Sequence, residues 1–467
     1  MTSWTLPPLD VLDPGDLAPV AVRVDCQGVA DALREHRIGV VEVNANIGPQ
    51  AVRYLIRLEP GVLPSKVERA TPAIGLALGA PPRYAGVIGD RVAVEVARAE
   101  RAGVTLSRVL GDPQAAGPGH ALPIPVGVDL DGLARMDDLA RLPHLIVAGT
   151  TGAGKSAYLH AVVTSLLMRT TPDDVRLHLV DPKHVELTAY DGAPHVADLT
   201  TTASGALDLL RRFVDMMDAR YATLKEAGVR DIDAYNKMAR GVPDEMVPMK
   251  RHVLVVEELA DLLMSPVGPA IATRLERVAQ LGRAAGLHLV VATQRPSAKV
   301  LPELLRANVP ARAVFAVATP SDGLVALGAS GAYGTLTGKG DGLFKAPGVG
   351  EPVRFQSPFV SADEVARVVA WWKRQVVPMD EVVDTSHIPV SGSVLREGAE
   401  LRASLDLDAM RRDAARAEAM REVGLEPSYR TPEDVLAGYG FTPEVVGALT
   451  AVITDGVVAG IRKELGL

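Results

Sequence analysis

The chain has 467 residues, of which 48% are hydrophobic, and this length and composition exclude a disordered protein and require more than one hydrophobic core. A net charge of −8 and an aromatic content of 4% argue against a basic protein that coats nucleic acid and against base stacking as the main mode of recognition. The single cysteine, Cys26, excludes an internal disulfide framework and a cysteine-based metal site.

The first elements along the chain predict an arm followed by a small α+β domain. Residues 1–20 are rich in proline and acidic side chains and are typical of an extended arm. Residues 21–113 combine two patterns, because helical spacing occurs in "DCQGVADALREHRI" and "SKVERATPAIGLALGA", whereas strand-like runs occur in "GVVEVNANIGPQAVRYLIRLEPG" and "DRVAVEVARA". The stretch "GDPQAAGPGHALPIPVG" then predicts a domain boundary.

Residues 114–378 predict an α/β fold with a doubly wound parallel sheet. Strand-like runs alternate there with helical segments, and the runs are "HLIVAG", "VRLHLVD", "HVLVVEE", "LHLVVAT" and "ARAVFAV". Residues 379–467 predict a linker and a C-terminal helical module. No run is long and apolar enough to span a bilayer and the N-terminus does not resemble a signal peptide, so we expect a cytoplasmic protein whose membrane association, if any, depends on a partner.

The segment "GTTGAGKS" fully matches the phosphate-loop pattern G-x-x-x-x-G-K-[ST] between a predicted strand and a predicted helix. Its backbone N–H groups converge on phosphate oxygens only if glycines allow the conformation, and the following helix directs its positive end to the same place. Lys155 is expected to reach the β- and γ-phosphates, and the Ser156 hydroxyl is expected to bind Mg²⁺. The predicted ATP-binding residues are Gly149, Thr150, Thr151, Gly152, Ala153, Gly154, Lys155 and Ser156.

An acidic pair follows the buried strand predicted in "RHVLVVEELADLL". An ATPase needs a carboxylate near the metal and a base for the attacking water, so we assign Glu257 to the magnesium side and Glu258 to the catalytic base. The alternative is an ordinary strand end with solvated acids. Glutamate is longer than the aspartate usual at the first position, so its geometry differs from the common arrangement.

Several longer segments resemble the motor domain of FtsK/SpoIIIE-type DNA translocases. They are "GTTGAGKSAYLHAVVTSLL", "DPKHVELTAYDGAPH", "GVRDIDAYN", "VEELADLL", "GRAAGLHLVVATQRPS", "LLRANVPARAVFAV" and "GKGDGLF". "GPQAVRYLIRLEPGVLPSKVERA" is also similar to the small domain that precedes this motor. The resemblance covers the first four fifths of the chain and implies a RecA-like core, a homo-oligomer in the form of a hexameric ring, and ATP-driven movement along double-stranded DNA.

The resemblance also implies roles for four residues outside the phosphate loop. Arg283 in "GRAAG" corresponds to an arginine that reaches the ATP of a neighbouring subunit. Gln294 is placed like a γ-phosphate sensor, or equally like a strand-end amide that stabilises the next turn. Arg295 and Arg306 correspond to DNA-contacting pore positions, for which surface ion pairing is the alternative.

The sequence departs from the family pattern in two places. Pro320 and Leu324 stand where the family usually has a lysine and an arginine, which removes part of the expected DNA-contacting charge. The C-terminal segment does not clearly match the family's winged-helix domain, and a divergent DNA reader, a docking module and a packing cap all remain open for it. We slightly favour a cap or docking role.

The leading functional hypothesis is an ATP-hydrolysing translocase of double-stranded DNA in plasmid or mobile-element transfer or in chromosome segregation. The first alternative is a secretion-type ATPase of the same superfamily that moves protein, and the second is a regulatory ATP-binding ring. Asp181 and Lys183 in "DPKHVEL" face the nucleotide side of such a sheet, although a structural turn explains them equally well. His184, His195 and His288 lack the spacing of metal ligands.

Overall fold

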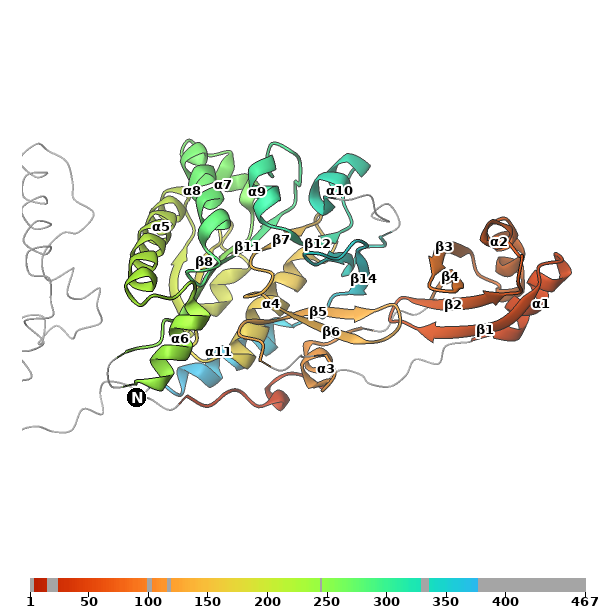
Figure 1. The fold of residues 1–467 in the computed structure, drawn as a ribbon, viewed down its shortest axis with the longest axis horizontal. Coiled ribbons are helices and arrows are strands. Elements are labelled where there is room, and N and C mark those ends of the chain that lie inside the picture. Colours follow the sequence, from red (N-terminus) through yellow and green to blue (C-terminus); the bar gives the residue numbers. More distant parts are fainter. Residues whose placement is uncertain are drawn as a thin grey trace, which may run out of the picture. The chain divides into compact units, whose positions relative to one another are not determined.

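A computed structural model describes residues 4–14, 24–98, 103–115, 119–243, 246–328 and 336–376. These residues belong to one compact unit, Met1–Val377, which contains a four-stranded and a ten-stranded sheet (Figure 1). The predicted C-terminal helical module at 379–467 lies outside the described residues.

The four-stranded sheet is antiparallel with the order β1-β2-β4-β3. Its strands are β1 (Val40–Ile47), β2 (Ala51–Leu58), β3 (Pro82–Ile88) and β4 (Arg91–Ala97). Helices α1 (Cys26–Glu35) and α2 (Pro64–Leu78) pack against it through a core that includes Leu33, Ile56 and Ile74. This sheet and its two helices lie in the range predicted as a small α+β domain, and β3 is an additional strand that has no alternating apolar pattern to reveal it.

The ten-stranded sheet has the order β6-β5-β14-β13-β12-β7-β11-β10-β8-β9. Its first half along the chain consists of β5 (Pro123–Asp129), β6 (Ala134–Asp138), β7 (Leu145–Ala148), β8 (Val175–Val180) and β9 (Val196–Thr200). The second half consists of β10 (Arg251–Val256), β11 (Leu287–Thr293), β12 (Ala311–Phe315), β13 (Asp341–Lys345) and β14 (Val353–Gln356). The six strands from β12 to β9 are parallel: five of them are the runs predicted from the sequence, and β9 is an additional strand. The other four strands pair antiparallel.

Helices cover both faces of this sheet (Figure 1). On one face lie α4 (Lys155–Arg169) and α11 (Ala362–Lys373), whose apolar side chains join one core cluster. On the other lie α5 (Ala203–Glu226), α7 (Leu259–Leu263), α8 (Gly268–Leu281), α9 (Glu303–Asn308) and α10 (Pro320–Leu327). Two further helices are α3 (Leu106–Gly111) and α6 (Ile232–Gly241), and two 3₁₀ turns are η1 (Leu9–Val11) and η2 (Leu187–Tyr190).

The described part of the predicted N-terminal arm packs against the large sheet unit. Leu12 is 1% exposed, and the ring of Trp4 lies 5.9 Å from that of Trp372 in α11. The backbone N–H of Asp13 donates to the carboxylate of Glu364 at the start of α11. Residues 4–14 contain a 3₁₀ turn at Leu9–Val11, and the apolar side chains of Trp4 and Leu12 pack against the core.

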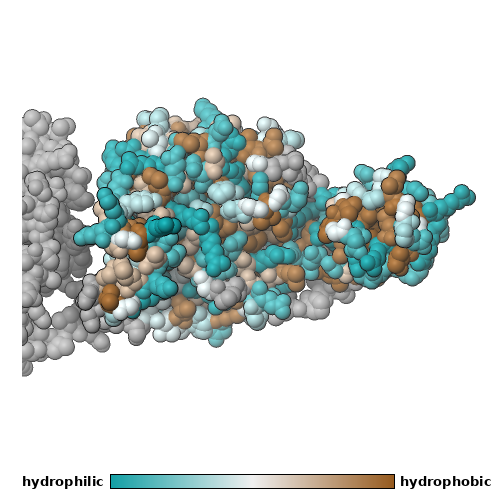
Figure 2. Space-filling model, in the orientation of Figure 1, coloured by the Kyte–Doolittle hydropathy of each residue, from teal (hydrophilic) through white to brown (hydrophobic). Residues whose placement is uncertain are grey.

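Figure 2 shows hydrophilic residues over much of the visible face of the part that contains the ten-stranded sheet, with hydrophobic residues scattered between them. Within the described ranges, no helix combines the length and the apolar character that a membrane crossing requires.

Candidate active site

The segment between β7 and α4 forms the predicted loop. Gly152 and Gly154 have φ values of 76° and 114°, which a residue with a Cβ atom rarely adopts. A Cβ on Gly154 would also lie 2.4 Å from the backbone nitrogen of Gly340, so this glycine is required by a close approach of two backbones as well as by its own conformation.

Two neighbouring segments hold the loop from either side. Thr150 donates its backbone N–H and its hydroxyl to the carbonyl of Ala316 at 2.9 and 3.1 Å. On the other side Gly340 donates its N–H to the carbonyl of Ala153 at 2.8 Å. The next residue, Asp341, is fully buried and forms an ion pair with Arg354, whose Nη2 lies 2.7 Å from Oδ2 of Asp341. The shape of the loop is therefore fixed by tertiary contacts from outside the motif itself.

Lys155 and Glu257 form a buried ion pair at the start of α4. The Nζ atom of Lys155 donates to Oε1 and to the backbone carbonyl of Glu257, both at 2.9 Å, and the two side chains are 3% and 2% exposed. The second carboxylate oxygen of Glu257 is buried with no hydrogen-bond partner among the described residues. A buried carboxylate oxygen of this kind is a suitable acceptor for the water shell of a cation.

Glu258 points to the end of the neighbouring strand β11. Its carboxylate accepts hydrogen bonds from the Thr293 hydroxyl at 2.7 Å and from the Gln294 backbone N–H at 3.0 Å. The Gln294 side chain in turn accepts a hydrogen bond from the Thr151 hydroxyl at 2.9 Å. The structure thus brings Glu258, Gln294 and the phosphate loop together, as their positions after adjacent strands predicted.

The loop after β8 is organised around Asp181. This carboxylate is fully buried and accepts hydrogen bonds from the backbone N–H groups of Lys183, Glu186 and Leu187. The structural-turn interpretation therefore describes Asp181. Lys183 is exposed, and its Nζ lies 3.8 Å from Glu258 and 3.7 Å from Asp261.

Two residues beside the phosphate loop were not identified from the sequence. The Glu186 carboxylate lies 2.9 Å from Nε2 of His160, which belongs to α4. Hydrogen bonds from His160 and from the Ser156 hydroxyl hold the pKa of Glu186 below its usual range, against the effect of desolvation. A signal was present, because His160 follows Ser156 by four residues and therefore lies on the same face of the helix.

The structure places Arg283 away from the phosphate loop of its own chain. It lies in the connection between α8 and the amino end of β11, where it is exposed, whereas the loop follows the carboxyl end of β7. Its positive charge contributes to lowering the pKa of His144, which precedes β7. Any contact of Arg283 with a nucleotide must therefore involve the ATP of another subunit.

The two predicted DNA-contacting arginines have different surroundings. Arg295 is exposed at the carboxyl end of β11, next to Gln294. Arg306 is half-buried in α9 and donates from Nε to the carbonyl of Leu301 at 2.9 Å. Pro320 and Leu324, which replace the charges usual in the family, are both exposed on α10, and Leu324 is 51% exposed.

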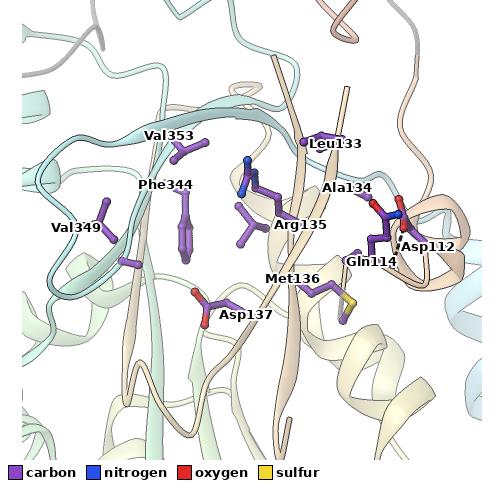
Figure 3. A pocket seen from close by; sticks show the side chains of 13 residues that line it. Asp112, Gln114, Leu133, Ala134, Arg135, Met136, Asp137, Phe344, Val349 and Val353 are labelled. Carbon is purple, nitrogen blue, oxygen red and sulfur yellow. Dashed lines mark hydrogen bonds between the residues drawn. The ribbon is translucent and has the colours of Figure 1, made fainter. Parts of the chain in front are cut away.

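A cavity of about 320 Å³ lies elsewhere in the large sheet unit, between the β5–β6 hairpin and β13–β14 (Figure 3). Arg135 and Asp137 from β6 lie on the side of Phe344 and Val353, whereas Met136 extends toward Gln114. Burial raises the pKa of Asp137. None of the phosphate-loop residues lines this cavity, so it is separate from the candidate active site.

Comparison with known proteins agrees with the geometry. Residues 105–298 match the FtsK/SpoIIIE family. The chain is 38% identical over 393 residues to a DNA translocase FtsK of Streptomyces avermitilis, covering 81% of this chain and 43% of the relative. It is 34% identical over 403 residues to that of Pseudomonas aeruginosa, covering 80% of this chain and 49% of the relative. The chain thus spans less than half the length of these relatives.

Among solved structures, the pCW3 conjugation coupling protein TcpA with ATPγS is similar in fold. The match has a TM-score of 0.52 and 21% identity, and it covers 74% of this chain and 98% of that structure.

Proposed function

Residues 105–298 belong to the FtsK/SpoIIIE family, and on that basis we propose that this chain is an ATP-hydrolysing motor that moves double-stranded DNA. The observation that carries the proposal is the convergence of three strand ends on one loop. Lys155 and Glu257, which follow β7 and β10, are buried there and hydrogen-bonded to each other. Glu258 is also buried and accepts a hydrogen bond from Thr293 at the end of β11. Buried charges in such an arrangement are typical of a site that handles a charged ligand.

In this proposal residues 149–156 bind the triphosphate of ATP. The N–H groups of the loop and the amino end of α4 supply partial positive charge, and Lys155 exchanges Glu257 for phosphate oxygens when nucleotide is bound. Mg²⁺ fits the residues present, because the Ser156 hydroxyl begins α4 and a buried oxygen of Glu257 lacks a partner among the described residues. The metal would supply neutralisation of the charge that develops on the phosphates.

Hydrolysis is assigned to Glu258 as the base for the attacking water. Gln294 connects this base to the phosphate loop through Thr151, which suits a residue that responds to the γ-phosphate. Arg283 would complete the site from a neighbouring subunit, which requires a ring or another closed homo-oligomer.

Arg295 and Arg306 are the residues proposed to contact DNA, and they differ in how available their side chains are. Arg295 is exposed and next to the catalytic residues, but Arg306 already binds a carbonyl of its own chain. The relatives are named DNA translocases, and the structurally similar TcpA is named a conjugation coupling protein, so transfer of plasmid or other mobile DNA is the process we favour. Exposed Pro320 and Leu324 favour the second candidate, a motor for protein cargo.

ATPase activity with and without long linear duplex DNA tests the proposal. We expect DNA to stimulate hydrolysis at low salt, and we expect stimulation to fall as salt rises, because phosphate contacts release counterions. The double variant Arg295→Ala/Arg306→Ala should need more DNA for half-maximal stimulation and should depend less on salt, with the basal rate retained.

Lys155→Ala is the control for contaminating ATPases, since it should hydrolyse no ATP under any condition. If DNA does not change the rate of hydrolysis but an unfolded protein stimulates it, the result would favour the second candidate, a motor that moves protein. Absence of ATP binding by the wild-type chain would overturn both.

A further inference from the structure

A hydrogen-bonded cluster lies on the flank of the phosphate-loop helix and has no place in the roles assigned so far. Glu186 contacts Nε2 of His160 at 2.9 Å, and Nδ1 of His160 lies 3.0 Å from the Tyr190 hydroxyl. Tyr190 is fully buried and also contacts the Thr164 hydroxyl at 2.9 Å. Both nitrogens of the imidazole are therefore engaged, which fixes its orientation.

The backbone that carries Glu186 is also fixed. Its N–H donates to the buried carboxylate of Asp181 at 3.0 Å, and Leu187 donates to the same oxygen at 2.9 Å. His184, three residues after Asp181, has a left-handed φ of 56°, a conformation that is uncommon outside glycine and persists where the surroundings determine it. Backbone and side chain of Glu186 are thus both held in place from independent directions.

The object of this positioning is the Ser156 hydroxyl. Ser156 and His160 are one turn apart on the same face of α4, so the Glu186 carboxylate, which contacts His160 at 2.9 Å, is held on the face of the helix that carries Ser156. A hydroxyl has one proton and two lone pairs. If a cation takes a lone pair of Ser156 Oγ, the proton must point to an acceptor on the other side, and Glu186 is placed to accept it.

Without nucleotide, the partner of Glu257 is Lys155. One of its oxygens and its carbonyl accept from Lys155, so its orientation is set by the lysine. The sequence assigned the magnesium side to Glu257 and Ser156 alone, whereas the structure adds a second carboxylate next to Ser156.

We infer that Glu186 is a positioning residue of the metal–nucleotide site, which orients the Ser156 hydroxyl and is itself oriented by His160. This inference rests on the proposed ATP site, and it extends that site to the loop after β8. The alternative is a purely structural ion pair between Glu186 and His160. Both side chains are partly exposed, at 26% and 17%, and pairs of this kind contribute little to folding stability.

The test is a binding measurement on the full chain, with a fluorescent, slowly hydrolysed ATP analogue titrated in Mg²⁺ and in EDTA. We expect Glu186→Ala to weaken binding about tenfold in Mg²⁺ and to leave binding in EDTA unchanged, because residues that orient metal ligands typically contribute about 10- to 100-fold to metal affinity. Glu186→Gln keeps an acceptor oxygen without the charge and should give an intermediate loss. His160→Ala should resemble Glu186→Gln.

The control is Glu226→Ala, which removes an exposed carboxylate at the end of α5 and should change neither titration. An equal loss for Glu186→Ala in Mg²⁺ and EDTA, or no loss in either, would overturn the inference while leaving the ATP site intact. A wild-type chain that binds no analogue would overturn the inference together with the proposed function. Thermal unfolding without nucleotide or metal shows whether Glu186→Ala is folded. If it is not, the comparison of Mg²⁺ and EDTA titrations for Glu186→Gln tests the inference in its place.

Discussion

The two edges of the parallel strands bury polar groups in opposite ways. At the carboxyl edge, after β7 and β10, lie the charged side chains of Lys155, Glu257 and Glu258, each at most 3% exposed. At the amino edge lie His144, before β7, and His288, at the start of β11, which are 0% and 1% exposed. These two sets of side chains are equally inaccessible, yet the first set is charged and the two histidines are titratable groups that lack a charged partner in the part of the chain that the structure describes.

The carboxyl edge can bury charge because every charged group has a close partner there. Lys155 is paired with Glu257. Glu258 accepts hydrogen bonds from the Thr293 hydroxyl and from the backbone N–H groups of Gln294 and Ala260. Such charges are costly to bury alone, and removing one partner destabilises the other. A ligand of opposite charge can replace a partner, which makes this edge suitable for chemistry.

The buried histidines of the amino edge are instead held in their neutral form. Desolvation lowers the pKa of His144 to about 3 and that of His288 to about 4. His195, before β9, has a pKa of about 4 for the same main reason. His288 and His195 each bond one backbone carbonyl, of Pro143 and Thr170, and their second nitrogens are buried without a partner among the described residues. At this edge burial keeps the imidazoles neutral, whereas the charges of the carboxyl edge are kept by close partners of opposite charge.

The largest expected effect concerns the carboxyl edge. Glu258→Gln retains the size of the side chain and an oxygen that can accept from Thr293 and Gln294, but it cannot accept a proton from water. We expect hydrolysis to fall on the order of 10³-fold, with ATP binding retained, because general bases contribute about 10²–10⁴-fold. Single-turnover hydrolysis and binding of an ATP analogue measure the two quantities separately.

Asp261→Asn is the matched control, since Asp261 is near Lys183 but does not contact the strand ends. If Glu258→Gln retained most of the hydrolytic activity, Glu258 would not be the general base. The buried charges of the carboxyl edge would then have no demonstrated part in catalysis.

The sequence predicted five of the six parallel strands because most of their residues are apolar, as in Val253 to Val256 of β10, whereas β9, with the sequence VADLT, has no such run. It also predicted the convergence of Lys155, Glu258 and Gln294, because residues that follow parallel strands meet at one edge. In both cases the relevant signal is local to a few neighbouring residues.

The antiparallel strands and the flank of the site could not be predicted in the same way. β5 contains Pro123 and Pro125, which are unusual in a strand, and the register shifts between Pro125 and Gly127. Glu186 reaches α4 only because Asp181 folds the intervening loop. These features depend on contacts between segments, for which the sequence has no periodic signal.

A second prediction tests whether the amino edge takes part in chemistry across a subunit boundary. Arg283→Ala should retain ATP binding and lose on the order of 10²-fold in turnover, because each donor to the transition-state charge contributes about that much. Mixing Arg283→Ala with Glu258→Gln should restore part of the activity, since some interfaces then combine an intact base with an intact arginine.

Arg277→Ala, which removes an exposed α8 arginine paired with Asp218, is the control. If the mixture is no more active than its components, Arg283 does not act on a neighbour and the amino edge is structural throughout.

The smallest expected effect is a pH dependence of stability that originates at the amino edge. A histidine whose folded pKa is lowered contributes stability above its unfolded pKa, of about 6.5, and this contribution is lost as pH falls toward the folded value. For His195, with a folded pKa of about 4, the free energy of unfolding should fall by up to about 1.4 kcal/mol per pH unit between those values.

His195→Gln can still donate to the carbonyl of Thr170 but does not titrate, so its free energy of unfolding in urea should vary less with pH over this window. The control His36→Gln replaces an exposed histidine and should follow the wild type. Identical pH profiles for His195→Gln and the wild type would show that this histidine is not kept neutral by burial, and the contrast between the two edges would then be one of position only.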